Sequence, residues 1–148
     1  MNTVLITGAA GFIGRTLADR LRADGATVRG VDFGADPERE IVAGDIAARG
    51  AWQDAATGCD TVIHTAAIVS NAASIDDAWR ANVLGTRNVL DAAAAAGARR
   101  FVHFSSVRAF GDTGFPDGVD ERWPVRPDGH TYVDTKIASE QVVLQAHA

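Results

Sequence analysis

The sequence predicts an α/β fold in which a parallel β-sheet carries helices on both faces. Short apolar runs rich in β-branched residues alternate with amphipathic helical segments along the chain. Helices that link parallel strands must return over the sheet, so this alternation distributes them over both faces. The 148 residues suffice for one hydrophobic core but are short for two, so we expect a single domain over residues 1–148.

Strands are expected where a short apolar run ends at glycine or at a polar residue. The expected strands are residues 1–7, 27–32, 40–44, 60–64 and 100–104. Between the third and fourth of these runs, residues 48–57 show only a weak helical pattern.

Three helices are expected between and after these strands. Apolar residues recur every four positions in residues 12–23, and Ser74 is a good N-cap for a long helix that ends at Gly97. One side of that long helix is expected to carry Trp79, Val83, Thr86 and Leu90. Residues 131–145 form the last helix, after a loop at residues 111–129 whose length suggests a functional role.

Composition and charge exclude several classes of protein. The net charge of −5 repels nucleic acid phosphates and anionic membrane surfaces, so neither partner is expected. Apolar stretches fall far short of the roughly 20 residues of a membrane span, and the N-terminus lacks an export pattern, so we expect a cytoplasmic protein. Cys59 has no partner cysteine, and we expect it to pack as a small apolar residue. The four histidines lack metal-ligand spacing, so no metal site is expected at His64, His103, His130 or His147, which are assigned to packing or to the surface.

The glycine-rich turn TGAAGFIG, residues 7–14, predicts a dinucleotide site. Gly8, Gly11 and Gly14 lie between the first strand and the first helix, where absent side chains let backbone amides approach a pyrophosphate. Asp32 ends the second strand at the spacing expected for a carboxylate that binds the adenosine ribose. The same charge repels a 2′-phosphate, so NAD is expected rather than NADP, with Arg15 and Arg29 as the residues that could weaken this preference.

Tyr132 and Lys136 are the candidate acid-base pair. Residues four apart share a helix face, and a cation near a phenol favours its ionised form. Such a tyrosine could exchange a proton with a substrate. Ser105 and Ser106 stand where the fifth strand ends, which is where ligands bind in open α/β sheets. A hydroxyl there would hold a substrate oxygen opposite Tyr132.

Taken in order, these motifs resemble the extended short-chain dehydrogenase/reductases, also called the NAD-dependent epimerase/dehydratase family. The glycine turn is similar to the family's TGxxGxxG motif, SSVRAFG to SSxxVYG, and YVDTK to YxxxK. The resemblance implies a Rossmann-type doubly wound sheet of order 3-2-1-4-5. It implies cofactor contacts from Gly8, Gly11, Phe12, Ile13, Gly14, Asp32, Asp45, Ile46, Ala66, Ala67, Tyr132 and Lys136.

By the same resemblance, Tyr132 would take the proton of a substrate alcohol while a hydride leaves its carbon for the nicotinamide. Ser106 would orient the oxygen, Lys136 would bind the ribose and favour the phenolate, and Asn82 would support the proton path. The substrate would be a small alcohol or carbonyl compound, such as a nucleotide sugar or a sterol-like molecule. Relatives often dimerise through the two helices that hold Asn82 and Lys136, so a homodimer is a further expectation.

Departures from the family pattern leave alternatives open. Val107 and Arg108 follow Ser106 where sugar dehydratases carry an acidic pair, so dehydration is disfavoured. Extended members continue for roughly as long again, which suggests that a C-terminal substrate region is missing and that the chain is a fragment. A nucleotide-sugar epimerase, a non-catalytic NAD(P)-binding module and an inactive fragment therefore remain alternatives. Trp123 and Phe115 either line a substrate mouth or fold onto the sheet.

Overall fold

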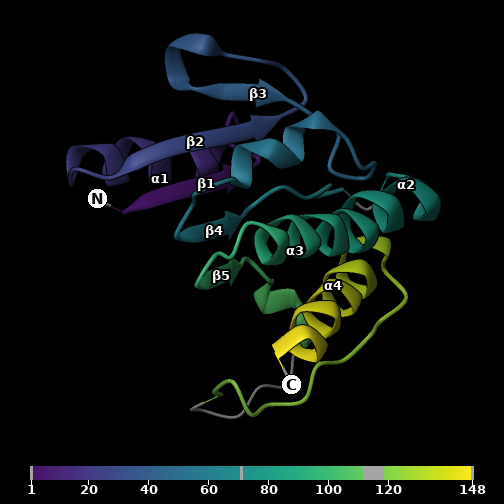
Figure 1. Cartoon of the computed structure of the whole chain (residues 1–148). Coiled ribbons are helices and arrows are strands. Elements are labelled where there is room, and N and C mark those ends of the chain that lie inside the picture. The colour runs from purple at the N-terminus through teal and green to yellow at the C-terminus, as the bar shows by residue number, and fades with distance from the viewer. Residues whose placement is uncertain (1, 71, 112–118, 148) are drawn as a thin grey trace.

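The computed structural model describes residues 2–70, 72–111 and 119–147. Five parallel strands form one sheet in the order β3-β2-β1-β4-β5 (Figure 1). The strands are β1 (Thr3–Thr7), β2 (Thr27–Asp32), β3 (Ile41–Ala43), β4 (Thr61–His64) and β5 (Arg100–His103). The parallel sheet and its predicted order are confirmed.

In the part of the chain that the structure describes, four α-helices and four shorter helical segments connect and follow these strands. The α-helices are α1 (Phe12–Ala23), α2 (Ile75–Trp79), α3 (Gly85–Ala95) and α4 (Thr131–His147). The 3-10 segments are η1 (Pro37–Arg39), η2 (Ala51–Ala56) and η4 (Val107–Phe110), and η3 (Arg80–Leu84) is a π-helical turn. The region with the weak helical pattern thus folds as the 3-10 segment η2, while the bounds of α1 and β2 are those predicted.

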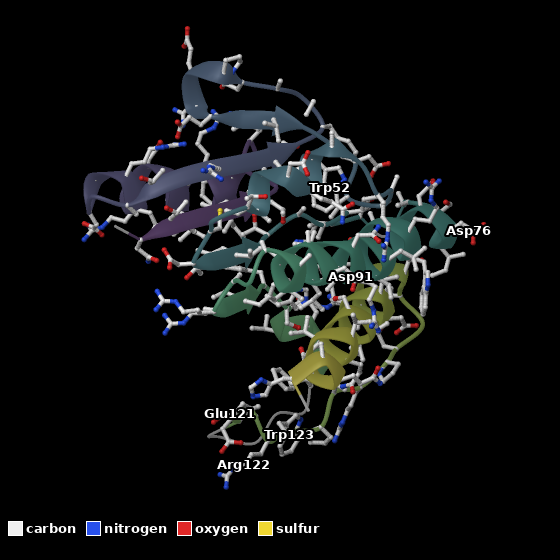
Figure 2. All side chains as sticks on the ribbon, viewed as in Figure 1. Trp52, Asp76, Asp91, Glu121, Arg122 and Trp123 are labelled. Carbon is white, nitrogen blue, oxygen red and sulfur yellow. The ribbon has the colours of Figure 1, made fainter. Side chains whose placement is uncertain are left out.

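The sheet has a separate core on each face because neighbouring residues of a strand point to opposite sides. Val4 and Ile6 of β1 pack with Ala18 of α1 on one face. Leu5 packs on the other face with Trp52 and with the apolar side of α3, and Figure 2 shows Trp52 on that side of the sheet. Helices therefore cover both faces, as predicted.

The segment expected as one helix from Ser74 to Gly97 is divided by the π turn. Ser74 does cap it, since its hydroxyl accepts a hydrogen bond from the Asp77 amide, and the Gly85 amide donates to the carbonyl of Arg80 across the π turn. The expected common face is wrong for Trp79, which is 45% exposed. The wider turn rotates the residues before it relative to those after it.

Helix α4 packs against α3, the π turn and η4, so the last helix of the chain lies on the α3 side of the sheet. Within the described residues β5 forms one edge of the sheet, as the sequence led us to expect. In the same part of the chain, no helix combines the length and apolar character needed to cross a bilayer.

Candidate active site

A cavity of about 560 Å³ opens where the glycine turn meets the carboxyl ends of the strands. Its lining includes ten of the predicted cofactor residues: Gly8, Gly11, Phe12, Ile13, Gly14, Asp32, Asp45, Ile46, Ala66 and Ala67. Sequence reasoning did not assign the remaining residues of the lining: Ala10, Val31, Phe33, Gly44, Thr65, Ile68, Val69 and Ala81. Most of these are direct neighbours of assigned residues, so strand ends alone would have identified them.

The glycine turn is tight because two of its glycines touch backbone. Gly8 has a φ of +73°, and a Cβ on it would lie 2.8 Å from the backbone of Ala66. A Cβ on Gly14 would lie 2.2 Å from the Gly8 carbonyl oxygen. A Cβ on Gly11 would meet only that oxygen, at 3.2 Å, and Gly11 is exposed at the cavity. Gly8 and Gly14 are therefore required by the fold, whereas Gly11 leaves room for a ligand.

The N-terminus of α1 is suited to bind an anion. No side chain caps this helix, and its first turn contains no acidic residue. Its first amide N–H groups and the positive end of its dipole therefore face the cavity without a competing carboxylate. The turn and helix fit the pyrophosphate of a dinucleotide.

Asp32 is held at the cavity wall by two backbone amides. One carboxylate oxygen accepts a hydrogen bond from Ala10 N at 2.8 Å, and the other accepts from Phe33 N at 2.8 Å. Through the first bond, Asp32 also fixes the glycine turn. The sequence indicated a ligand-binding role for this carboxylate but gave no signal for this second role.

Asp45 and Ile46 follow β3 and form another part of the wall. Asp45 is exposed, and its carboxylate accepts a hydrogen bond from Ala47 N at 2.9 Å. Ile46 is buried, and Asn88 of α3 donates to its carbonyl at 2.8 Å. The carboxylate is therefore open to a ligand while the neighbouring residue anchors the segment to α3.

Lys136 and Tyr132 lie outside the cavity lining, on α4. Lys136 is 4% exposed, and its Nζ donates to the carbonyl of Phe104, just after β5, at 2.5 Å. Burial lowers the pKa of Lys136 to about 8, opposed by the charge of Glu140. Tyr132 is half-buried, and no described residue accepts a hydrogen bond from its hydroxyl. The phenol thus remains available to a substrate.

The two serines after β5 have different environments. Ser106 is half-buried and caps η4, its hydroxyl accepting from Arg108 N at 3.2 Å. Ser105 is exposed and donates to the Glu140 carboxylate. Since η4 packs against α4, Ser106 lies on the segment that faces the helix of Tyr132.

Asn82 connects the cavity to α4. It is 1% exposed, and its amide oxygen accepts from Ile68 N at 2.8 Å. Its amide nitrogen donates to the carbonyl of Ile68 at 3.1 Å and to the Thr135 hydroxyl at 2.9 Å. Ile68 lines the cavity and Thr135 lies between Tyr132 and Lys136 on α4, so Asn82 joins the two parts of the site.

The loop before α4 lies apart from the cavity. Trp123 packs beneath Arg126, whose guanidinium carbon lies 5.6 Å from the ring centroid. Figure 2 places Glu121, Arg122 and Trp123 at the end of the molecule farthest from β3. Phe115, the other candidate for a substrate mouth, lies outside the described residues, as do Gly114, Pro116 and Gly118 of the predicted loop. Elsewhere in the described chain, no cluster of three or more metal-ligating side chains occurs.

The buried ammonium predicts a pH-dependent stability. The folded chain releases the Lys136 proton near pH 8, whereas the unfolded chain holds it to about 10.5. Between these values the unfolded state binds more protons, so the free energy of unfolding rises with pH. Raising the pH from about 7 to about 10 should stabilise the wild type by roughly 3 kcal/mol relative to Lys136→Met, as measured by urea unfolding. If the free energies of unfolding of the two proteins changed with pH in the same way, this prediction would be wrong.

The parallel sheet of order β3-β2-β1-β4-β5, with a glycine turn after its central strand, defines an α/β protein of the Rossmann class. The sequence pattern of the NAD dependent epimerase/dehydratase family matches residues 4–148. The chain belongs to this family, the extended short-chain dehydrogenase/reductases.

Three similar proteins illustrate the range of the family. A 3 beta-hydroxysteroid dehydrogenase/Delta 5→4-isomerase of Mycobacterium tuberculosis is 36% identical over 97% of this chain and 42% of its own length. A short-chain dehydrogenase/reductase superfamily protein from Agrobacterium tumefaciens, solved with bound NAD, is 38% identical with a TM-score of 0.86, over 96% of this chain and 44% of its own. MoeE5, solved with UDP-glucuronic acid and NAD, is 34% identical with a TM-score of 0.86, over 99% of this chain and 50% of its own. The chain thus spans about half the length of these relatives or less.

Proposed function

We propose that this chain binds NAD and supplies the proton-transfer residues of an oxidoreductase that acts on a substrate alcohol or carbonyl. The observation that carries the proposal is the cavity itself. Its wall combines an uncapped helix N-terminus, a glycine turn that opens at Gly11 and a carboxylate fixed at Asp32. These are the groups that a pyrophosphate and an adenosine ribose require.

Bound NAD would accept a hydride from the carbon of the alcohol. Tyr132, as its phenolate, would accept the proton of the alcohol oxygen, and Ser106 would orient that oxygen by a hydrogen bond. Lys136 would place a positive charge on the same helix face as Tyr132 and favour the phenolate. Asn82 would keep α4 aligned with the cavity wall through its contacts to Ile68 and Thr135.

Titration with NAD, followed by NADH absorbance in the presence of an alcohol, tests this function. NAD should bind, and an alcohol substrate should give a net rise in NADH. A chain that binds NAD but turns over no alcohol would favour the non-catalytic module. A chain that does not bind NAD would refute the proposal.

A nucleotide-sugar epimerase is the second candidate, and the similarity to MoeE5, solved with UDP-glucuronic acid and NAD, supports a nucleotide sugar as the substrate. An epimerase returns the hydride to the sugar, so NADH does not accumulate, whereas a dehydrogenase leaves it in solution. Incubating the chain with NAD and either a 3β-hydroxysteroid or UDP-glucuronic acid separates the two candidates. NADH formation supports the dehydrogenase, and a changed sugar without net NADH supports the epimerase.

The carboxylate of Asp32 predicts a preference for NAD over NADP. Asp32→Asn removes the negative charge and replaces one of the two acceptor oxygens by an NH2 donor, which weakens the acceptor for the ribose hydroxyls and removes the repulsion of a 2′-phosphate. We expect NAD to bind about tenfold more weakly and NADP to bind more tightly than to the wild type. Calorimetric titration with both cofactors measures the change, with Asp24→Asn, at the C-terminal end of α1, as the control. An unchanged ratio of the two affinities in Asp32→Asn would argue against the ribose role.

Dimerisation is a further part of the proposal. About half of the residue surface is exposed at Trp79 of α2, Leu84 of the π turn and Leu144 of α4. Relatives are expected to dimerise through these helical segments. Sedimentation velocity of the wild type beside Leu84→Glu tests this, since a charge in a helical interface should shift a dimer toward the monomer.

A further inference from the structure

Hydrogen bonds connect five buried polar residues across the molecule, and the hydrogen-bond chain passes through Asn82 by way of its backbone carbonyl and its side chain. Thr7, His64, Asn82, Thr86 and Thr135 are each at most 1% exposed. His64 Nδ1 lies 2.6 Å from the Thr7 hydroxyl, and His64 Nε2 lies 2.9 Å from the Thr86 hydroxyl. The Thr86 hydroxyl donates a hydrogen bond to the backbone carbonyl of Asn82 at 2.6 Å. The side-chain amide of Asn82 donates to the Thr135 hydroxyl.

Each bond in this chain has a defined direction. Thr86 uses its single hydroxyl hydrogen on the Asn82 carbonyl, so toward His64 it can only accept. His64 must therefore carry its hydrogen on Nε2, which leaves Nδ1 to accept from Thr7. At the other end, Thr135 donates to the carbonyls of Thr131 and Tyr132 and accepts from Asn82. The hydrogen-bond chain as a whole therefore requires His64 to be neutral.

The surroundings of His64 favour this neutral form. The ring of His103 stacks on it, with ring centroids 5.5 Å apart. Burial, followed by the charges of His103 and Lys136, holds the pKa of His64 well below its usual range. An imidazolium could not accept from Thr7, so protonation would break the first bond of the chain.

The ends of the hydrogen-bond chain lie at the two parts of the proposed site. Thr7 directly precedes Gly8 of the glycine turn, and Thr135 lies between Tyr132 and Lys136. In between, the Asn82 side chain also holds both backbone polar groups of Ile68 in the cavity wall. These bonds therefore connect the wall of the nucleotide cavity to α4.

We propose that His64, as its Nε2–H tautomer, is a positioning residue that sets the geometry between the NAD cavity and the helix of Tyr132 and Lys136. This inference rests on the proposed function. His64 touches neither cofactor nor substrate, and acts through Thr7 on the glycine turn and through Thr86 and Asn82 on α4.

Three variants test this role. Thr86→Val keeps the shape of the side chain but removes the hydroxyl, whereas Thr86→Ser keeps the hydroxyl. Ser139→Ala is the matched control. It removes a buried hydroxyl of α4 that contacts His103 and takes no part in the hydrogen-bond chain. The readouts are the ¹⁵N NMR signals of the His64 ring, the NAD dissociation constant, and urea unfolding to confirm that each variant is folded.

In the wild type we expect a protonated Nε2 and a bare Nδ1 on His64 from about pH 5 to pH 8. Thr86→Val should perturb the Nε2 signal and weaken NAD binding about tenfold, because it leaves buried polar groups without partners. Thr86→Ser should restore affinity to within about threefold of the wild type, and Ser139→Ala should leave it unchanged. If Thr86→Val does not fold, the pair Thr135→Val and Thr135→Ser replaces the Thr86 pair.

Two results would overturn the positioning role: a wild-type His64 that is charged or protonated on Nδ1, or a folded valine variant with wild-type NAD affinity. A third result separates this role from the proposed function. If the wild type shows the expected tautomer but binds no NAD, the proposed function fails, and the hydrogen-bond chain is then purely structural.

Discussion

Replacing Tyr132 by phenylalanine should lower turnover by about 10²- to 10⁴-fold, the usual contribution of a positioned acid or base. The change removes one oxygen from a half-buried ring whose hydroxyl bonds to no described residue, so folding should be preserved. NAD affinity should stay within about twofold of the wild type, because Tyr132 lies outside the cavity lining. Steady-state kinetics with NAD and the active alcohol measure the loss in kcat.

The matched control for this experiment is Ser105→Ala, which removes an exposed hydroxyl at the end of β5 that bonds to Glu140 rather than to a reacting group. It should keep most of the activity. A Tyr132→Phe enzyme with wild-type kcat would show that another group carries the proton. A loss confined to KM would instead assign Tyr132 to substrate binding.

Gly14→Ala should be the most destabilising change in the glycine turn. Its Cβ would lie 2.2 Å from the Gly8 carbonyl oxygen and 2.9 Å from Ala9 Cα, and backbone atoms cannot move aside as a flexible side chain can. We expect a loss of about 3 kcal/mol or more in the free energy of unfolding, measured in urea, at the upper end of the range for overpacked sites. Any protein that still folds should bind NAD poorly, because the turn must open.

Gly34→Ala is the comparison for that loss. Gly34 has no neighbour within 4 Å of an added Cβ, and its φ lies outside the left-handed region. This variant should stay within about 0.5 kcal/mol of the wild type. Equal stability of the two alanine variants would mean that the close approach of α1 to the glycine turn does not exist in solution.

The parts of the fold that the sequence predicted well depend on local signals. The first βαβ unit has clear apolar periodicity and a glycine at each reversal, and the bounds of α1 and β2 were predicted to the residue. The glycines of the turn were found because they follow the first strand, whereas most of the other cavity residues were supplied by the resemblance to the family. Asp32 was found by its distance along the chain from the glycine turn.

The polar interior could not be predicted in this way. Thr7 and His64 lie 57 positions apart, and His64 and Thr86 lie 22 apart, so no local pattern links their side chains. His64 was expected to be a packing or a surface residue and is buried, and its two hydroxyl partners appear only in three dimensions. Trp79 was misplaced for a different reason, since a π turn leaves no clear mark in the spacing of apolar residues.

The π turn also constrains the number of residues that this segment can contain. The Arg80 carbonyl is bonded five residues ahead, at Gly85, instead of four, so the turn accommodates one position more than a regular helix. Deleting a single residue there would give an unbroken α-helix with no strained backbone. Because the wide turn already absorbs the extra position, the helical segments on either side would keep nearly the same relative orientation. Asn82 lies within the wide turn, so closing that turn would shift the side chain that bonds Ile68 and Thr135 while the flanking helices stay in place.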